Sequence, residues 1–280
     1  MKKTSDIVLA SKISDWLKEY LKKSGLKCFV VGVSGGIDSA LVSTLCARTG
    51  MPTTVISISI SSHPKNTQSS LDHCDWLKEN FPNVQVLYTD LTESFKALEG
   101  DLLQLASTED TRGLALANAK SRLRMITMYH IATVNSGIVV GTGNKVEDFG
   151  IGFFTKYGDG GVDISPIADL TKTQVRSLAA SLGVLSKIVE AKPTDGLWED
   201  NRTDEDQIGA SYEELEWAMD WIGKTQTYEK FILEENELTK NLSQRQLQVL
   251  RIFIGLNQKN KHKMLPIPVF VENNILNFKN

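Results

Sequence analysis

The chain has 280 residues, enough for one large domain or two small ones that fold without disulfides or structural metals. Hydrophobic residues make up 41% of the sequence and charged residues 23%, which is typical of a globular protein and excludes a disordered or collagen-like chain. Thirty-one basic and 34 acidic residues leave a net charge of −3, so the overall positive charge of a nucleic-acid-binding protein is missing. Local groups must therefore hold any anion that the protein binds.

The cysteines and the apolar runs indicate where the protein works. Cys28, Cys46 and Cys74 are odd in number and widely spaced, and they form no Cys-x-x-Cys pair, which favours a reducing compartment. The apolar run from Ile7 to Ala10 is too short for the core of a signal peptide. About 18 consecutive apolar residues, the length of a membrane span, occur nowhere. We expect a cytoplasmic protein without a membrane segment.

Helices and strands alternate over the first half of the sequence. Apolar residues recur at three- and four-residue steps from Ile7 to Leu21, which predicts an amphipathic helix that ends at Ser24-Gly25. Strands are predicted at Cys28–Val33, Thr53–Ile60, Val84–Tyr88 and Gly137–Val140, and helices between them at Ile37–Arg48, Gln68–Asn80 and about Leu114–Val134. This alternation predicts an α/β fold with a doubly wound, Rossmann-like parallel sheet, which binds its ligand at the carboxyl ends of the strands.

Helical patterns dominate beyond Leu170. They cover Thr171–Leu182, Tyr212–Ile222 and Ser243–Leu256. We expect a single domain over residues 1–280, with an α/β core at 1–170 and a mainly helical extension at 171–280 that packs on the same sheet. The polar, acidic stretch 192–206 predicts a surface loop that is able to move. Its acidic run from Asp200 to Asp206 is most simply a solvated face, although a lid over the ligand would use the same residues. The isolated histidines are interpreted as structural or surface residues: His63, His73 and His130.

A glycine-rich turn follows the first predicted strand, with the sequence Gly32-Val33-Ser34-Gly35-Gly36-Ile37-Asp38-Ser39. Between a strand and a helix, backbone N–H groups and the positive end of the helix dipole converge on an anion. The lysine of the common P-loop is absent and Asp38 stands near its place. A carboxylate beside phosphates requires a divalent cation between them, so Asp38 predicts Mg²⁺, while Ser34 and Ser39 predict hydrogen bonds to phosphate oxygens. The alternative is a tight turn that uses glycine only for close packing.

The segment 137–161 holds eight of the 20 glycines, a density that suggests backbone lying close to a ligand. Thr142 and Glu147 follow the fourth predicted strand at the edge expected to face the ligand. There Glu147 would offer Mg²⁺ a second carboxylate, and Thr142 would offer a bound nucleotide a hydrogen bond. The next stretch, 150–163, places aromatic residues, a lysine and acids among glycines, which suits a flat aromatic ligand with a charged substituent.

Several of these motifs occur together in a known family. The string Ser34-Gly35-Gly36-Ile37-Asp38-Ser39 resembles the pyrophosphatase-type loop of the adenine nucleotide α-hydrolase-like superfamily, whose members cut ATP between the α and β phosphates. Further motifs in the same order resemble the ammonia-dependent NAD synthetases, over nearly the whole chain: Asn118–Met125, Gly141-Thr142 with Glu147, Gly152–Gly161, Ser165–Val175, Lys192-Pro193-Thr194, Thr203–Asp206 with Tyr212–Glu214, and Lys261-His262-Lys263.

The resemblance implies a ligase that uses ATP, Mg²⁺ and ammonia to convert nicotinate adenine dinucleotide (deamido-NAD) to NAD, the last step of NAD biosynthesis. The reaction passes through an adenylated intermediate and releases AMP and pyrophosphate. Family members are homodimers, so we expect a dimer through the long helix around 114–134. The resemblance assigns ATP to Gly32 through Ser39, Thr142, Lys172 and Thr194, Mg²⁺ to Asp38 and Glu147, and the dinucleotide to Arg122, Lys156, Asp163, His262 and Lys263. Asp38, Glu147, Lys172 and Asp163 would be catalytic, with Asp163 a candidate acceptor for the proton of ammonia.

One departure concerns the nitrogen source. Many ammonia-dependent members carry Asp after the Gly-Thr, whereas Gly143-Asn144-Lys145 is more similar to the glutamine-dependent relatives. Too few residues precede the phosphate loop or follow Leu170 for an ordinary glutaminase domain, so we expect free ammonia unless a separate protein delivers it.

Other readings remain open. A tRNA-modifying enzyme of the same fold should show a basic surface or a reactive cysteine pair. A non-catalytic nucleotide-binding regulator would need neither Glu147 nor Lys172. For individual residues, His262 could belong to a solvated basic tail, and Arg122 to a salt bridge on a helix.

Overall fold

The computed structural model describes residues 2–61, 64–105, 109–191, 193, 203–225 and 239–270. Thr194 and most of the expected surface loop lie outside the described residues. No helix in these ranges combines the length and the apolar character needed to cross a bilayer.

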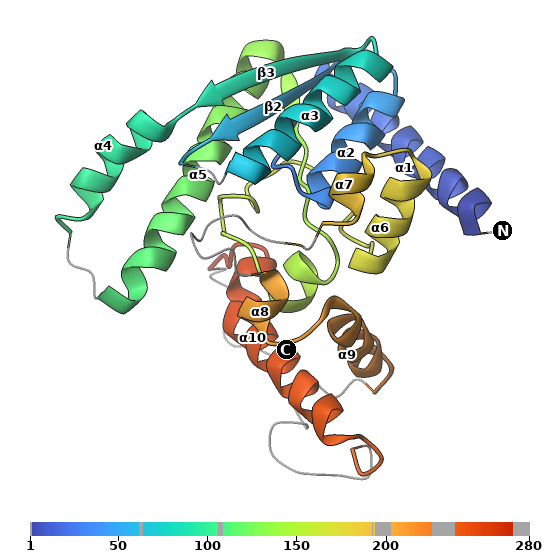
Figure 1. Cartoon of the computed structure of the whole chain (residues 1–280), viewed down its shortest axis with the longest axis vertical. Coiled ribbons are helices and arrows are strands. Elements are labelled where there is room, and N and C mark those ends of the chain that lie inside the picture. Colours follow the sequence, from blue (N-terminus) through green and yellow to red (C-terminus); the bar gives the residue numbers. More distant parts are fainter. Residues whose placement is uncertain are drawn as a thin grey trace.

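The strands form a parallel sheet with the order β3-β2-β1-β4. They are β1 (Cys28–Gly32), β2 (Thr53–Ser59), β3 (Val84–Asp90) and β4 (Gly137–Val139). Figure 1 shows β2 and β3 in the upper part of the molecule. The chain runs from β1 outward to β2 and β3, and then returns to β4 on the other side of β1. The strand order therefore reverses between β1 and β4, and a ligand of this fold binds at the carboxyl ends of those two strands. The prediction of a doubly wound α/β fold is confirmed.

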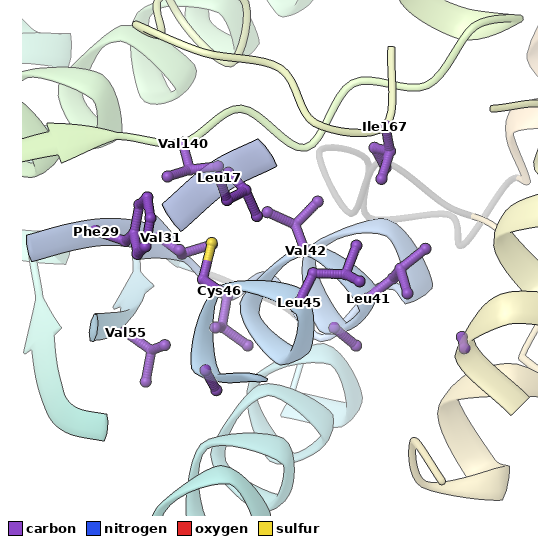
Figure 2. Packing of buried hydrophobic residues seen from close by; sticks show 14 of the residues in the cluster. Leu17, Phe29, Val31, Leu41, Val42, Leu45, Cys46, Val55, Val140 and Ile167 are labelled. Atoms are coloured by element: carbon purple, nitrogen blue, oxygen red, sulfur yellow. The ribbon is translucent and has the colours of Figure 1, made fainter. Parts of the chain in front are cut away.

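Alternate residues of β1 explain why helices cover both faces of the sheet. Phe29 and Val31 pack with the helices α1 (Lys2–Ser24) and α2 (Ile37–Arg48), in the hydrophobic cluster that Figure 2 shows. Cys28 and Val30 point the other way, toward Met128 and Ala132. Those two residues belong to the helix α5 (Glu109–Asn135). Because side chains alternate across a strand, a continuous apolar run such as this one is buried on both faces.

The remaining elements lie around this sheet. The helices α3 (Pro64–Asn80), α4 (Thr92–Leu102), α6 (Lys172–Ser181), α7 (Ser186–Val189), α8 (Asp204–Ile208), α9 (Tyr212–Thr225) and α10 (Gln244–Met264), and the π-helical turn η1 (Glu147–Ile151), complete the described chain. The patterns of the sequence did not predict α4, α7, α8 or η1, which are short or carry few apolar residues.

The helical second half packs in two places. The helices α6 and α7 join the cluster around α1 and α2 through Val175, Leu178 and Ile188. By contrast, α9 and α10 form a second cluster with η1, around Tyr212 and Phe253, and lie below the sheet in Figure 1. The helices α6 and α7 thus share the core on one side of the sheet by packing on α1 and α2. The expectation of packing on the sheet is wrong for α9 and α10, because their apolar faces meet each other and η1.

The end of α10 also differs from the prediction. The helix continues to Met264, whereas the apolar pattern predicted an end at Leu256. Beyond that point Asn257 and Asn260 donate side-chain hydrogen bonds to the carbonyl oxygens of Gly150 (2.7 Å) and Ile151 (2.8 Å). Polar contacts hold this part of the helix, so hydrophobic periodicity could not reveal it. As a result His262 lies in the last helical turn and not in a tail.

Candidate active site

The glycine-rich turn connects β1 to α2 at the point where the strand order reverses. Ser39 Oγ accepts a hydrogen bond from the Ser34 N–H (3.2 Å) and donates to the Gly36 carbonyl (2.9 Å), while Ser34 Oγ accepts from the Gly36 N–H (3.2 Å). Gly35 has φ +89°, which favours glycine. Ser34 and Gly36 are exposed, and no side chain caps α2. The turn therefore presents the positive end of α2 to a ligand.

Three elements bring Asp38, Glu147 and Lys172 together beside this turn. Asp38 lies in the first turn of α2, Glu147 begins η1, and Lys172 begins α6. Lys172 Nζ lies 2.6 Å from Asp38 Oδ2 and 2.9 Å from Glu147 Oε1. A capping box formed by Thr171 and Gln174 starts α6 directly before the lysine, which fixes the direction in which it leaves the backbone. The lysine is 2% exposed, so its charge is balanced by the two carboxylates.

Asn144 connects the same two carboxylates from another side. Its Nδ2 donates one hydrogen bond to Asp38 Oδ1 (3.1 Å) and another to Glu147 Oε2 (2.6 Å). Its Oδ1 accepts from the backbone N–H groups of Val146 and Glu147, each at 3.1 Å. Because the oxygen faces two donors, the orientation of the amide is determined. In the sequence Asn144 stands out only within the departure at 143–145, and no local pattern indicates that it bridges two carboxylates.

Tyr212 and Asp204 are further members of the site that sequence reasoning missed. The Tyr212 hydroxyl donates to Glu147 Oε1 and lies 3.1 Å from Asp204 Oδ2. Lys172 Nζ lies 4.9 Å from the centre of the tyrosine ring. Tyr212 is fully buried and Asp204 is 6% exposed, so the interpretation of Asp200–Asp206 as a solvated face is wrong for Asp204. The only signal in the sequence was the motif match of 203–206 and 212–214, which assigned no role.

Burial and charge determine the protonation of these groups. Burial by itself lowers the pKa of Lys172, but the carboxylates of Asp38 and Glu147 outweigh it, so the pKa lies above its ordinary value. Burial, with Glu147 and Asp204 adding to it, raises the pKa of Tyr212 far above its ordinary value. Lys172 is therefore an ammonium and Tyr212 a neutral phenol.

Asp148 occupies the space beside Gly143. A Cβ atom at residue 143 would overlap the Asp148 carboxylate. Burial, and then the charges of Asp159, Glu147 and Asp38, raise the pKa of Asp148 well above its ordinary value. The glycine that departs from the pattern of many ammonia-dependent members therefore makes room for an acid from the next turn.

The donors of this cluster fit a magnesium ion. The Asp38 and Glu147 carboxylates converge on one cation, and hard carboxylate oxygens are ligands that Mg²⁺ prefers. Within the described ranges, no three His, Cys, Asp or Glu side chains are grouped to hold a metal. Mg²⁺ is usually held by one or two carboxylates together with substrate phosphates, so two acids beside a phosphate-binding turn are sufficient.

A second group of predicted residues meets between α5, the loop after η1 and the end of α10. Lys156 Nζ donates to the His262 carbonyl (2.9 Å), and Arg122 Nε donates to the Lys156 carbonyl (3.3 Å). Lys263 Nζ donates to the Phe154 carbonyl (2.7 Å), and burial lowers its pKa. In the part of the chain that the structure describes, Arg122, Lys156 and Lys263 form no ion pair with a carboxylate. Their charge is available to an anionic ligand, and the helix salt bridge considered for Arg122 does not form in that part.

The other predicted residues lie elsewhere. Asp163 Oδ2 accepts from the Val139 N–H (2.8 Å) and Oδ1 from the Tyr129 hydroxyl (2.9 Å), so these bonds connect the end of β4 to α5. Its hydrogen bonds do not involve either group of site residues described above. Thr142 is partly buried in the loop after β4.

The turn, the buried carboxylates with their lysine and the separate group of cations are features of a nucleotide-binding α/β protein. Comparison with known proteins gives the family. The family model described as NAD synthase matches residues 9–266. A relative from Mesoplasma florum, named NH(3)-dependent NAD(+) synthetase, is 39% identical over 207 residues, which is 72% of this chain and 80% of the relative. A relative of the same name from Methanocaldococcus jannaschii is 32% identical over 256 residues, which is 91% of this chain and 93% of the relative.

Among solved structures, the NMN synthetase from Francisella tularensis superposes with a TM-score of 0.78 and 27% identity, covering 95% of this chain and 98% of that one. The chain belongs to the NAD synthase family.

Proposed function

We propose that the protein is an ammonia-dependent NAD synthetase, which amidates deamido-NAD to NAD and converts ATP to AMP and pyrophosphate. The convergence of Asp38, Glu147 and Lys172 on the first turn of α2 carries this proposal, because it places acids and a lysine where a triphosphate would bind. The curated relatives from Mesoplasma florum and Methanocaldococcus jannaschii carry that activity in their names.

The residues of the turn and the lysine act on ATP. The N–H groups at the start of α2 bind phosphate oxygens, with Thr142 and Thr194 as further contacts to ATP. Lys172 is already next to the turn and supplies positive charge to the triphosphate. The nicotinate carboxylate of deamido-NAD attacks the α-phosphorus and pyrophosphate leaves, while these preorganised groups stabilise the charge that develops. Ammonia then attacks the adenylated carbonyl carbon, and AMP leaves as the amide of NAD forms.

Asp38 and Glu147 would hold Mg²⁺. When bound, the ion neutralises negative charge on the triphosphate. Asn144 keeps both carboxylates at a fixed separation through its amide.

The cations of the second group bind the dinucleotide in this proposal. Arg122, Lys156, His262 and Lys263 come from three segments that the structure brings together. We retain Asp163 as a ligand of the dinucleotide and as the candidate that takes the proton of ammonia. Each of its oxygens accepts one hydrogen bond, which leaves each a lone pair for a further partner.

We further propose a homodimer that works in the cytoplasm. Exposed apolar side chains on α4 and α5 support the dimer: Leu98, Leu114, Ile126 and Val134. The cysteines are buried and unpaired, which suits a reducing compartment. Residues 1–280 act as one domain in this proposal, because Asp38 and Glu147 come from the first 170 residues and Lys172 and Tyr212 from the rest.

A second candidate differs only in the acceptor. The superposition on an NMN synthetase favours a mononucleotide as the alternative to the dinucleotide. The protein should be incubated with ATP, Mg²⁺ and ammonium and with either deamidated acceptor, and the products separated. NAD, AMP and pyrophosphate from the dinucleotide arm are expected. Turnover of the mononucleotide alone would establish the second candidate, whereas ADP, or no amide in either arm, would overturn both. Glutamine in place of ammonium should give no product.

A further inference from the structure

We propose that Tyr212, supported by Asp204, is a positioning residue that orients the Glu147 carboxylate toward the metal-bound triphosphate. This inference rests on the proposed function, because it concerns the same metal and nucleotide. Nothing in the resemblance assigned a role to either residue.

The hydrogen bonds of Glu147 show what the tyrosine contributes. Lys172 and Tyr212 donate to its Oε1, and Asn144 donates to its Oε2. Lys172 is the only charged donor of the three, and in the proposed reaction its ammonium turns toward phosphate oxygens. The two neutral donors remain. A phenol and an amide can hold a carboxylate in one orientation without cancelling its charge, and that charge is what a cation needs.

The ring and the backbone of Tyr212 are fixed by contacts outside the site. Its ring belongs to the second hydrophobic cluster, with Leu215 and Phe253, and its N–H donates to Glu205 Oε1 (2.9 Å). Its hydroxyl lies between Glu147 and Asp204. Tyr212 therefore connects the hydrophobic cluster of α9 and α10 to the site, which residues of α2, η1 and α6 form beside the sheet.

Asp204 anchors the hydroxyl. It begins α8 after a capping box between Thr203 and Asp206, and its N–H donates to the Pro193 carbonyl (3.2 Å). The backbone of Asp204 is therefore fixed at the start of α8, and its carboxylate Oδ2 lies 3.1 Å from the hydroxyl of Tyr212. The contact with the Tyr212 hydroxyl connects this carboxylate to Glu147.

If Tyr212 had only a structural role, its replacement by phenylalanine would leave the affinity for the metal unchanged. The variant Y212F keeps the ring in the cluster and under Lys172 and removes only the hydroxyl. Y88F is the matched control. The Tyr88 hydroxyl, on the edge strand β3, also donates to a carboxylate, Asp75 Oδ1 at 2.9 Å, and the Tyr88 side chain is exposed.

The experiment measures metal binding directly. Free Mn²⁺, used in place of Mg²⁺, is followed by electron paramagnetic resonance with the full chain and saturating ATP, without ammonium or dinucleotide. Y212F should raise the dissociation constant of Mn²⁺ by about 10-fold to 100-fold, the effect of one hydrogen bond to a charged group. Its melting temperature and the KM for the dinucleotide should stay close to those of the unmodified chain. Y88F should leave all three values unchanged.

Asp204 supplies a second test. D204A should weaken Mn²⁺ binding, D204N should restore most of it because an amide can still bond to the hydroxyl, and D204A should add nothing to Y212F, as expected when one residue acts through another. Unchanged Mn²⁺ binding in Y212F, or an equal loss of metal, dinucleotide and thermal stability, would overturn the inference. If the unmodified chain binds Mn²⁺ and ATP but makes no amide, the proposed function fails while the role of Tyr212 can still be measured.

Discussion

The ammonium of Lys172 lies 2.6 Å from the carboxylate of Asp38, across 134 residues of sequence. The pair joins the first turn of α6 to the first turn of α2, and Glu147 completes it from η1. The first turns of α2, η1 and α6 thus meet around one buried ammonium.

Replacing Lys172 with Met should destabilise the ligand-free protein. The substitution removes the cation and leaves two carboxylates facing each other in a largely buried place, with a cost of about 3–5 kcal/mol in the free energy of unfolding. Urea denaturation of the two proteins measures the difference. Since Lys172 also serves the triphosphate in the proposed reaction, turnover should fall as well. Equal stability would show that Asp38 and Glu147 do not depend on the lysine for charge balance.

Replacing Asp38 with Asn should abolish metal-dependent turnover while the fold remains. Lys172 keeps the Glu147 carboxylate as its partner when residue 38 is neutral, so no buried charge is left unpaired. We expect turnover at saturating substrates to fall by about 100-fold or more, the scale of removing one preorganised electrostatic group. Circular dichroism serves as the control for folding. Rates like those of the unmodified protein would exclude Asp38 as a metal ligand.

Replacing Arg122 with Ala should weaken the dinucleotide more than ATP. Arg122 lies on α5 beside Lys156 and is exposed, far along the chain from the phosphate turn. We expect the KM for deamido-NAD to rise by about 10-fold, the effect of one charge-assisted hydrogen bond, with the KM for ATP nearly unchanged. Steady-state kinetics with each substrate varied in turn would separate the two. An equal rise in both constants would contradict the assignment of this cation.

The stability of the protein should depend on pH through His73. This residue is fully buried between Ser43, which bonds its Nε2 at 3.0 Å, and the Trp76 ring. Burial lowers its pKa to about 4, from 6.5. The unfolded chain therefore binds the proton more readily, so the contribution of the neutral imidazole is complete above pH 6.5 and is lost as the pH falls toward 4.

At pH 5 the loss should amount to about 2 kcal/mol relative to pH 7. Denaturant titrations between pH 5 and 7 check this value. The variant H73N, which retains a hydrogen-bonding side chain beside Ser43, should show a flatter dependence over the same range. Parallel curves for the two proteins would mean that His73 does not titrate differently in the folded and unfolded states.

Much of this protein could be predicted from local patterns. The apolar run at 28–33 and the string Ser34 to Ser39 predicted β1, the turn and α2, because strand period, glycine and helix start are properties of neighbouring residues. The motif matches brought Arg122, Lys156, His262 and Lys263 into one group, and the structure places them together.

The tertiary structure decided the rest. Asn144 is a bridge because α2 and η1 both place a carboxylate beside it, and Asp204 is buried beside the hydroxyl of Tyr212. The last turns of α10 are held by the side-chain amides of Asn257 and Asn260, which donate hydrogen bonds to η1. Such polar contacts leave no hydrophobic periodicity in the sequence. Sequence by itself determined the alternation of strands and helices and the phosphate turn. Which side chains share a hydrogen bond or a charge depends on packing between distant segments, such as those of Asp38 and Lys172, 134 residues apart. A local sequence pattern carries no information about such contacts.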